Sequence, residues 1–209
     1  MQCPVQLPPF FRGPEYDVRA AGLPYHLADQ RLPDHWKQTG AGFGVIGGVC
    51  DTGCDRGHPE IEDKIVAARS FVGGDPGDRN GHGTHVATTI AGDNVGVAPS
   101  AKLAIAKVLG DNGSGSSKGV ADGIDWLVEQ GVNIINLSLG SPYDDPWTRD
   151  AIAKAKDAGV LVVAATGNER ANHVGYPARH CVGVGAVDRG LKLAYFSNRG
   201  KHVDLVGYG

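Results

Sequence analysis

Two residues in the first half of this chain have the chemistry of a general base and its partner. Asp51 comes directly after a short apolar run, and His82 lies at the start of a segment with helical periodicity. A histidine that acts as a general base needs a carboxylate, which fixes its tautomer and stabilises the imidazolium ion. Asp51 and His82 could supply such a pair if the fold brings them together.

Both residues also have simpler interpretations. An aspartate after a strand often caps a turn or a helix with its carboxylate. His82 and His85 are three residues apart and could suggest a metal pair. Helical zinc motifs, however, place two histidines at i and i+4 with a glutamate between them. The spacing therefore disfavours a metal site, and the prediction for metal-binding side chains is none.

A third polar residue could stabilise negative charge. Asn168 follows Gly167 in a predicted turn, where a side-chain amide could point at a developing oxyanion. It also follows an apolar run, as Asp51 does. These positions suggest that several strands deliver polar groups to one place.

The elements that would position these residues alternate between apolar runs and helical patterns. Buried strands are predicted at residues 44–50, 102–109, 132–137, 160–165 and 182–187. Helices are predicted at 118–130 and 146–158, the second with Trp147 on its apolar face. This alternation predicts an α/β fold, a three-layer, doubly wound parallel sheet with helices on both faces. Such sheets bind ligands beyond the carboxyl ends of their strands.

Four segments resemble, in order and spacing, the signatures of the subtilisin-like serine proteases, the subtilase family. They are residues 51–53, 80–87, 136–140 and 164–169. The resemblance covers the chain from about residue 30 to the C-terminus and implies a serine endopeptidase fold and chemistry. It implies that Asp51 orients His82, that His82 is the general base and acid, and that Asn168 helps to form the oxyanion hole. His85 would be a packed, structural histidine.

The resemblance also implies which residues bind an extended peptide substrate. They are Gly113, Ser114, Gly115, Ser138, Leu139, Gly140, Ala165, Gly167 and Gly175. The first six would form the two edges between which the peptide backbone pairs as an added strand. The last three would border the pocket for the residue before the scissile bond. Gly175 should leave that pocket deep enough for a large apolar side chain.

The intracellular subtilisins are the subgroup that the chain resembles most, on residues 51–55, 113–115 and 196–198. Residues 1–40 are Pro-rich and read as irregular, and 1–30 are assigned to an N-terminal extension that precedes a peptidase domain at 31–209. In that subgroup a comparable segment blocks the active site, and its counterpart here is Leu7, Pro8, Pro9 and Phe10. Proline lacks the N–H and fixes φ, so it can bend a bound strand out of cleavable register. An unstructured tail is the alternative.

The family's serine lies in a Gly-Thr-Ser-Met-Ala segment, which this sequence does not contain. We therefore expect a C-terminally incomplete domain that is inactive alone, with the serine beyond residue 209 or on a complementary C-terminal fragment. Residues 115–119 fit the G-x-S-x-G elbow of other hydrolases, but a polar loop rather than a strand precedes them. The alternative function is a non-catalytic relative that binds peptides or a partner through the substrate groove.

Composition excludes several other classes. The net charge of -3 gives no basic footprint for nucleic acid, and no apolar run reaches the ~18 residues of a membrane span. The first residues lack the pattern of a secretory signal, which favours a cytoplasmic location unless a signal has been removed. Because no signal is visible, free thiols are expected for the four cysteines rather than disulfides. A metal site on Cys50 and Cys54 is disfavoured, since a second Cys/His pair is lacking.

No cofactor is expected to be required for the chemistry. The resemblance leaves open a calcium ion or another cation on main-chain carbonyls near Ala178, His180 and Gly183. The loop at residues 93–96 is shorter than the calcium-binding loop of secreted relatives, so that strong site should be absent.

Overall fold

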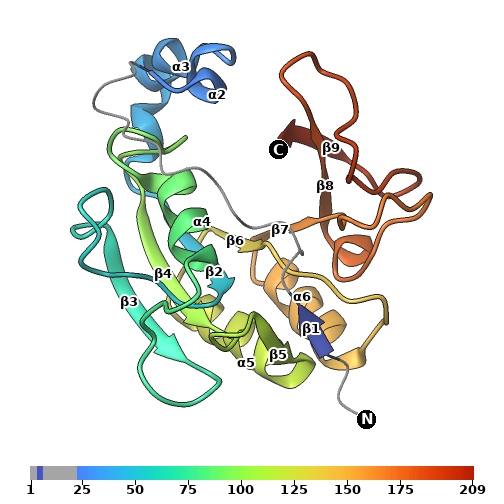
Figure 1. The fold of residues 1–209 in the computed structure, drawn as a ribbon. Helices are drawn as coiled ribbons and strands as arrows, with labels where there is room; N and C mark the ends of the chain where they lie inside the picture. Colours follow the sequence, from blue (N-terminus) through green and yellow to red (C-terminus); the bar gives the residue numbers. More distant parts are fainter. Residues whose placement is uncertain (1–3, 7–22) are drawn as a thin grey trace.

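The computed structural model describes residues 4–6 and 23–209 (Figure 1). Within this part of the chain, seven strands form a parallel sheet in the order β3-β4-β2-β6-β7-β8-β9. In chain order their bounds are β2 Ile46–Asp51, β3 Ile65–Ser70, β4 Lys102–Lys107, β6 Ile134–Leu137, β7 Leu161–Ala165, β8 Val182–Val187 and β9 Leu205–Tyr208. The predicted α/β class with a parallel sheet is confirmed.

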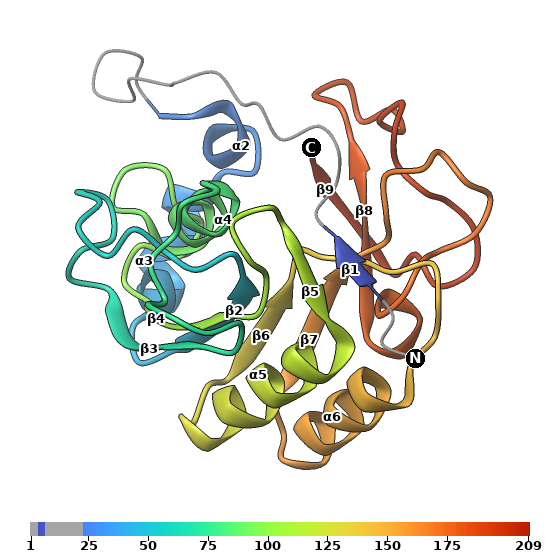
Figure 2. The same cartoon turned by 60° about the horizontal axis from the view of Figure 1, so that its bottom comes forward.

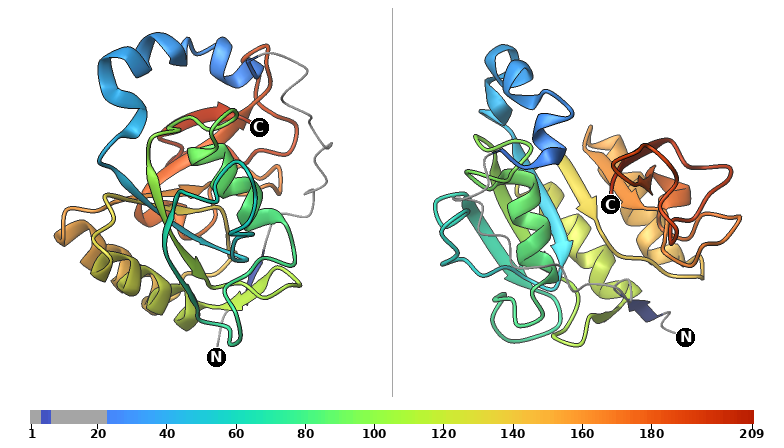
Figure 3. Two further views of the ribbon diagram at one scale, coloured as in Figure 1. Left: turned by 90° about the vertical axis from the view of Figure 1, so that its left-hand side faces the viewer. Right: turned by 45° about the horizontal axis from the view of Figure 1, so that its top comes forward.

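Helices cover both faces of this sheet. Their bounds are α2 Tyr25–Ala28, α3 Leu32–Thr39, α4 His82–Ala91, α5 Ser117–Glu129 and α6 Pro146–Asp157, with short 3-10 turns η1 Gly40–Gly42 and η2 Ala178–His180. Figure 2 shows α5 and α6 lying side by side against the sheet. Figure 3 shows α2 and α3, in blue, at the opposite end of the molecule from α5 and α6.

The core consists of two clusters because successive side chains of a strand point to opposite faces. In β4, Ala104 and Ala106 pack with the apolar stripes of α5 and α6. Leu103 and Ile105 of the same strand pack on the other face, with Ala87 of α4 among their neighbours. The alternation within one strand explains why a run of apolar residues is needed there: both faces are covered.

Two sequence expectations are wrong, and two strands were missed. Residues 23–40 are not irregular, because they contain α2 and α3. Trp147 is not on the buried face of α6, since it is 58% exposed while Ala151 and Ile152 are buried. Strands β3 and β9 were not predicted; they lie at the two edges of the sheet, where only one neighbouring strand pairs with each.

A second, small sheet joins the beginning of the chain to a central loop. Strand β1, Pro4–Gln6, pairs antiparallel with β5, Ser114–Ser116. Val5 lies opposite Gly115 in this register. Figure 2 shows β1 beside β5, above the ends of α5 and α6.

Candidate active site

Asp51 and His82 meet in the interior. Asp51 is the last residue of β2 and 0% exposed, and His82 is the first residue of α4 and 6% exposed. Asp51 Oδ1 and His82 Nδ1 are 2.7 Å apart, a short hydrogen bond between residues 31 positions apart in the chain. The two groups that the sequence proposed as an acid–base pair are thus in direct contact.

The carboxylate of Asp51 is held asymmetrically. Its Oδ1 also accepts a hydrogen bond from the Thr52 backbone N–H at 2.7 Å. Its Oδ2 is buried and has no hydrogen-bond partner among the described residues. Burial raises the pKa of Asp51, and the hydrogen bond and charge of His82 and the Thr52 N–H act against that rise. The imidazole is therefore the main group that compensates the desolvated carboxylate.

Asp78, which the sequence analysis missed, fixes the start of the histidine helix. Its Oδ1 accepts hydrogen bonds from the N–H groups of Asn80 and Gly81, and its Oδ2 accepts from the N–H and hydroxyl of Thr84. Burial alone would raise the pKa of Asp78, but these hydrogen bonds outweigh it and lower the pKa. An aspartate shortly before a predicted helix start was the available signal.

Two glycines let α4 approach the end of β2. A Cβ on Gly83 would overlap the backbone oxygen of Gly53. Gly53 itself has a φ of 104°, a conformation that favours glycine, and a Cβ there would overlap the Pro76 carbonyl oxygen. A side chain at Gly83 would push the histidine helix away from the end of β2, and one at Gly53 would displace the backbone of residues 76–77.

A buried lysine ties the Asp51 turn to the loop before β5. Lys107 is 4% exposed, and its Nζ donates to the Thr52 carbonyl oxygen and to Asp111 Oδ1. Asn80 Nδ2 donates to the Asp111 carbonyl oxygen at 2.9 Å. The loop that leads to the expected substrate edge is thereby joined to both sides of the Asp–His pair.

The strand order brings Asn168 to the same edge of the sheet as Asp51. Strands β2, β6 and β7 are neighbours and parallel, so the residues that follow them emerge at one edge (Figure 1). Asp51 ends β2, Ser138 to Gly140 follow β6, and Asn168 follows β7. Asn168 is half-buried and comes after Gly167, whose φ is 106°.

The residues expected around the primary pocket also lie together. The Gly175 N–H donates to the carbonyl oxygen of Thr166, which lies between Ala165 and Gly167. A Cβ on Gly175 would lie 3.5 Å from the Ser141 carbonyl oxygen and 3.6 Å from that of Thr166. Gly175 therefore faces the gap between the segments that follow β6 and β7.

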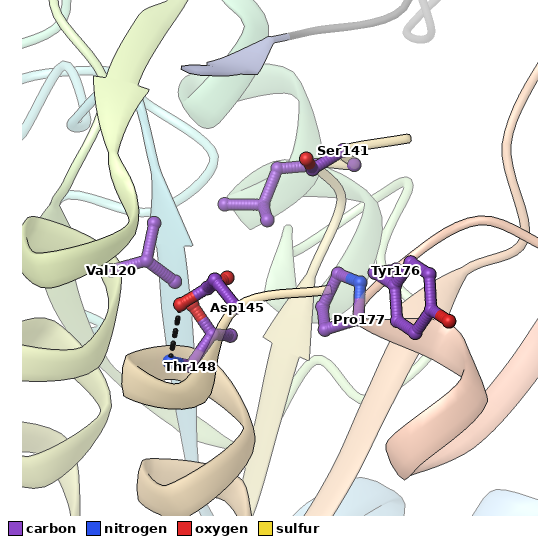
Figure 4. Close-up of a pocket in the computed structure, with 8 residues that line it drawn as sticks. Val120, Ser141, Asp145, Thr148, Tyr176 and Pro177 are labelled. Atoms are coloured by element: carbon purple, nitrogen blue, oxygen red, sulfur yellow. Dashed lines mark hydrogen bonds between the residues drawn. The ribbon is translucent and has the colours of Figure 1, made fainter. Parts of the chain in front are cut away.

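A small cavity lies beside these segments. Leu139 and Gly140, two of the expected substrate-binding residues, line it. The other lining residues are Val120, Ser141, Asp145, Thr148, Tyr176 and Pro177. Figure 4 shows Tyr176 and Pro177 on one side of it, and the Asp145–Thr148 hydrogen bond at the start of α6 on the other.

The first of the two expected substrate edges is paired with the beginning of the chain. The antiparallel pairing of β1 with β5 places Gln6 opposite Ser114 and Val5 opposite Gly115. Gly113, which precedes this strand, has a φ of 74°. Leu7, Pro8, Pro9 and Phe10, the expected blocking segment, lie outside the described residues.

The positions of His85 and Ser117 decide two further interpretations of the sequence. His85 is exposed on α4, so the expectation that it is packed is wrong. Ser117, the serine of the elbow-like segment, is 2% exposed at the first turn of α5, and the strand before it is the short β5 rather than a central strand. Ser116 accepts a hydrogen bond from the Gly119 N–H and caps α5. This segment does not form a nucleophile elbow.

No group of three or more His, Cys, Asp or Glu side chains in the described residues is arranged to hold a metal ion. At the carbonyls expected to bind a cation, Lys156 Nζ donates to the His180 carbonyl oxygen at 2.6 Å. An ammonium group thus already contacts one of these oxygens. The structure also contains, in its described ranges, no helix that is long and apolar enough to cross a membrane.

The cysteines with described positions are free thiols. Cys50 and Cys54 are fully buried, and Cys181 is half-buried. Burial raises the pKa of the Cys50 thiol and raises the pKa of Cys54 and of Cys181 to about 12. These thiols are protonated at neutral pH and are poor nucleophiles.

The chain is similar in sequence to several known proteins. The Major intracellular serine protease of Bacillus subtilis (strain 168) is 41% identical in an alignment 206 residues long that covers 90% of this chain and 65% of that protein. The Intracellular serine protease of Paenibacillus polymyxa is 43% identical over 197 residues, 86% of this chain and 60% of that protein. Subtilisin Savinase of Lederbergia lenta is 42% identical over 199 residues, 91% of this chain and 73% of that protein.

The chain spans under two thirds of the length of the first two relatives. Their names confirm the resemblance to intracellular subtilisins that the motifs indicated. The profile of the peptidase S8 family, described as the subtilase family, matches residues 42–209. This match includes β2, α4 and the segment after β7. The chain belongs to the subtilase family.

Proposed function

We propose that this chain carries the Asp–His part of the catalytic triad of a serine endopeptidase. The observation that carries the proposal is the 2.7 Å contact between Asp51 Oδ1 and His82 Nδ1 in a buried position. The serine comes from a segment beyond residue 209 or from a complementary C-terminal fragment. The chain alone is then inactive, because its sequence holds no Gly-Thr-Ser segment to supply the nucleophile.

In the proposed reaction, Asp51 holds the imidazole with Nδ1 protonated, which makes Nε2 the nitrogen that accepts the proton. The serine oxygen attacks the peptide carbonyl carbon while its proton passes to His82 Nε2. The C–N bond then breaks as His82 returns the proton to the leaving amine, and water hydrolyses the acyl-enzyme by the same steps. The side-chain amide of Asn168 donates to the oxyanion of the tetrahedral intermediate.

We propose that a peptide substrate binds between the two backbone edges and in the pocket beside them. An extended peptide would pair with the backbone of residues 113–115 on one side and 138–140 on the other. Its side chain before the scissile bond would enter between Ala165, Gly167 and Gly175. Two observations support this placement: the Gly175 N–H donates to the Thr166 carbonyl oxygen, and a Cβ on Gly175 would lie 3.5 Å from the Ser141 carbonyl oxygen.

The test is a complementation assay. The chain is mixed or fused with a segment that contains Gly-Thr-Ser-Met-Ala, read from the codons that follow residue 209, and cleavage of a chromogenic peptide is measured. We expect activity in the complex, none in the chain alone, and loss of activity with His82→Ala. Labelling of the chain alone by a fluorophosphonate would show that the nucleophile lies within residues 1–209 and would refute the proposal.

A regulatory part of the proposal concerns the beginning of the chain. Strand β1 pairs antiparallel with β5, as a bound substrate strand would. We propose that the beginning of the chain inhibits the peptidase, with Leu7, Pro8, Pro9 and Phe10 as the blocking segment that the resemblance implies. Deletion of residues 1–20 from the active complex should raise kcat/KM for a peptide substrate; unchanged activity would refute the blocking role.

The second candidate function is a peptide-binding relative without catalysis. The observation that favours it is the pairing of β5 with an extended segment in a chain whose sequence holds no Gly-Thr-Ser segment. Complementation separates the two: a complex that binds peptides but does not cleave them supports the second function. We place either function in the cytoplasm, on the names of the two intracellular relatives.

No cofactor takes part in the proposed chemistry. A cation on the carbonyls near Ala178, His180 and Gly183 remains a structural proposal, and Lys156 competes for the His180 carbonyl. Calcium titration followed by thermal unfolding tests it: an unchanged Tm at millimolar calcium would argue against the site.

A further inference from the structure

The side chain of Asn198 contacts the loop that carries Asn168 on both sides of that residue. Asn198 Nδ2 donates to the Thr166 carbonyl oxygen at 3.0 Å and to Glu169 Oε2. Asn198 Oδ1 accepts from the Glu169 N–H at 3.1 Å and from the Ala171 N–H at 2.8 Å. The Asn198 backbone N–H donates to the Gly167 carbonyl oxygen at 3.0 Å.

Asn198 is buried and its own position is fixed. It is 1% exposed, and its carbonyl oxygen accepts a hydrogen bond from Ser197 Oγ at 3.0 Å. Ser197 Oγ in turn accepts from the N–H of Ala186, which lies in β8. A chain of hydrogen bonds therefore runs from the central sheet through Ser197 and Asn198 to the loop.

The loop needs such support because its backbone is unusual. Gly167 has a φ of 106° and Arg170 a φ of 58°, so two residues close to Asn168 are in the left-handed region. A non-glycine residue with this φ is uncommon and is kept by its surroundings. A Cβ on Gly167 would overlap Asn198 Nδ2 and Glu169 Oε2. The amide of Asn198 therefore occupies the space beside Gly167 that a side chain would need.

An amide suits this position better than other side chains. One carbonyl oxygen and one carboxylate oxygen accept hydrogen bonds here, and two backbone N–H groups donate them. Only Asn or Gln offers two N–H donors and an oxygen acceptor from one planar group. An aspartate would place a second carboxylate against Glu169 and the Thr166 carbonyl. A serine would be too short to reach both sides of the turn.

We infer that Asn198 is a positioning residue that fixes the amide of Asn168 for the oxyanion. The inference rests on the proposed endopeptidase function. It adds that this function also depends on Asn198, which lies outside the triad and the oxyanion hole. Removing one oxyanion donor lowers kcat by about 10²- to 10³-fold, a magnitude measured in subtilisin, a member of this family. Misplacement by about 1 Å can cost about 10²-fold. Loss of the Asn198 amide leaves the donor present but misplaced, so its cost should not exceed about 100-fold.

The first test uses the active complex of the chain with its serine-bearing segment. Asn198→Asp is expected to lower kcat by about 10- to 100-fold with little change in KM, because the ground state does not use the oxyanion donor. Asn172→Asp is the matched control. Asn172 is exposed in the same region and accepts a hydrogen bond from Arg199, so the same chemical change there should leave kcat unaltered.

A double-mutant cycle separates positioning from general destabilisation. If Asn198 acts through Asn168, then Asn198→Asp should have almost no further effect on kcat in an Asn168→Ala background. Equal effects in both backgrounds, or an unchanged kcat in the single variant, would overturn the inference. Asn198→Ser is the second variant if Asn198→Asp does not fold.

A second measurement needs no activity and keeps the inference separate from the proposed function. Hydrogen exchange of the backbone amides of residues 167–171, followed by NMR in the 209-residue chain, should speed up in Asn198→Asp but not in Asn172→Asp. If the parent complex does not cleave peptides, the endopeptidase proposal fails. The exchange rates of residues 167–171 then test by themselves whether Asn198 positions the loop. Unchanged exchange in Asn198→Asp would overturn the positioning role.

Discussion

The hydroxyl of Thr52 donates a 2.9 Å hydrogen bond to Asp78 Oδ1, and the same hydroxyl accepts one from the Gly83 N–H at 2.9 Å. Thr52, which follows Asp51, is therefore hydrogen-bonded both to the Asp78 carboxylate before α4 and to the backbone of α4 at Gly83. This link holds the end of β2 and the beginning of the histidine helix as one unit.

Loss of the Asp78 carboxylate should destabilise this unit. Asp78→Ala removes the acceptor of several hydrogen bonds at a helix start, and we expect the free energy of unfolding to fall by about 1–3 kcal/mol. Urea unfolding measures the change. Asp75→Ala is the control, since its carboxylate is 66% exposed and forms an exposed ion pair with Arg56; it should cost under ~1 kcal/mol.

The same carboxylate predicts a response to acid. The pKa of Asp78 is lower in the folded state than in the unfolded state, so its contribution is present above the unfolded pKa of about 3.9 and is lost as pH falls through the folded pKa. The stability difference between the parent and Asp78→Asn should thus shrink as pH falls below about 4. A difference that stays constant between pH 6 and pH 2 would contradict the assignment.

Gly83→Ala tests the close approach of α4 to β2. Its Cβ would overlap the Gly53 carbonyl oxygen, which belongs to the backbone and cannot rotate away. We expect about 1–3 kcal/mol of destabilisation from overpacking, together with a longer contact between Asp51 and His82. Thermal unfolding gives the first result, and the imidazole NMR signals of His82 give the second.

Gly57→Ala is the matched control for that substitution. Gly57 is exposed, and a Cβ there would meet only Asp55 Oδ1, at 3.6 Å. Its effect should stay within about 0.5 kcal/mol. Equal effects of the two substitutions would mean that the packing of Gly83 on Gly53 has no special role.

Gly175→Val tests the proposed pocket in the active complex. A Cβ at this position makes ordinary contacts with the Ser141 and Thr166 carbonyl oxygens, and the additional methyl groups would fill the pocket. We expect kcat/KM for peptides with Phe before the scissile bond to fall about 10-fold or more relative to peptides with Ala there. An unchanged Phe-to-Ala ratio would place the pocket elsewhere.

Thiol labelling tests the burial of Cys54. The thiol is fully buried, and its pKa is raised to about 12, so iodoacetamide should label it only after unfolding. Mass spectrometry of peptides from native and urea-treated protein measures this. Rapid labelling of Cys54 in the native chain would show that the turn after β2 opens readily.

The central strands could be predicted because both of their faces are covered. The run at 182–187 matches β8 at both ends, and the other predicted strands overlap β2, β4, β6 and β7. The edge strands could not be predicted in this way. In β9, Leu205 is 61% exposed and Val206 is 55% exposed, so no continuous buried pattern marks the strand. Helix α3 has no buried residue, and a polar, proline-containing segment gives a weak signal.

The sequence by itself determined the alternation of strands and helices and the chemical types of the groups at the ends of β2 and β7, because periodicity and residue type are local properties. Only the tertiary structure decided which of these groups touch. The contacts of Asp51 with His82, of Asp78 with Thr52 and of Asn198 with the Asn168 loop each join residues 26 to 32 positions apart. Such hydrogen bonds depend on where separate loops converge at the edge of the sheet, and no local pattern encodes that convergence.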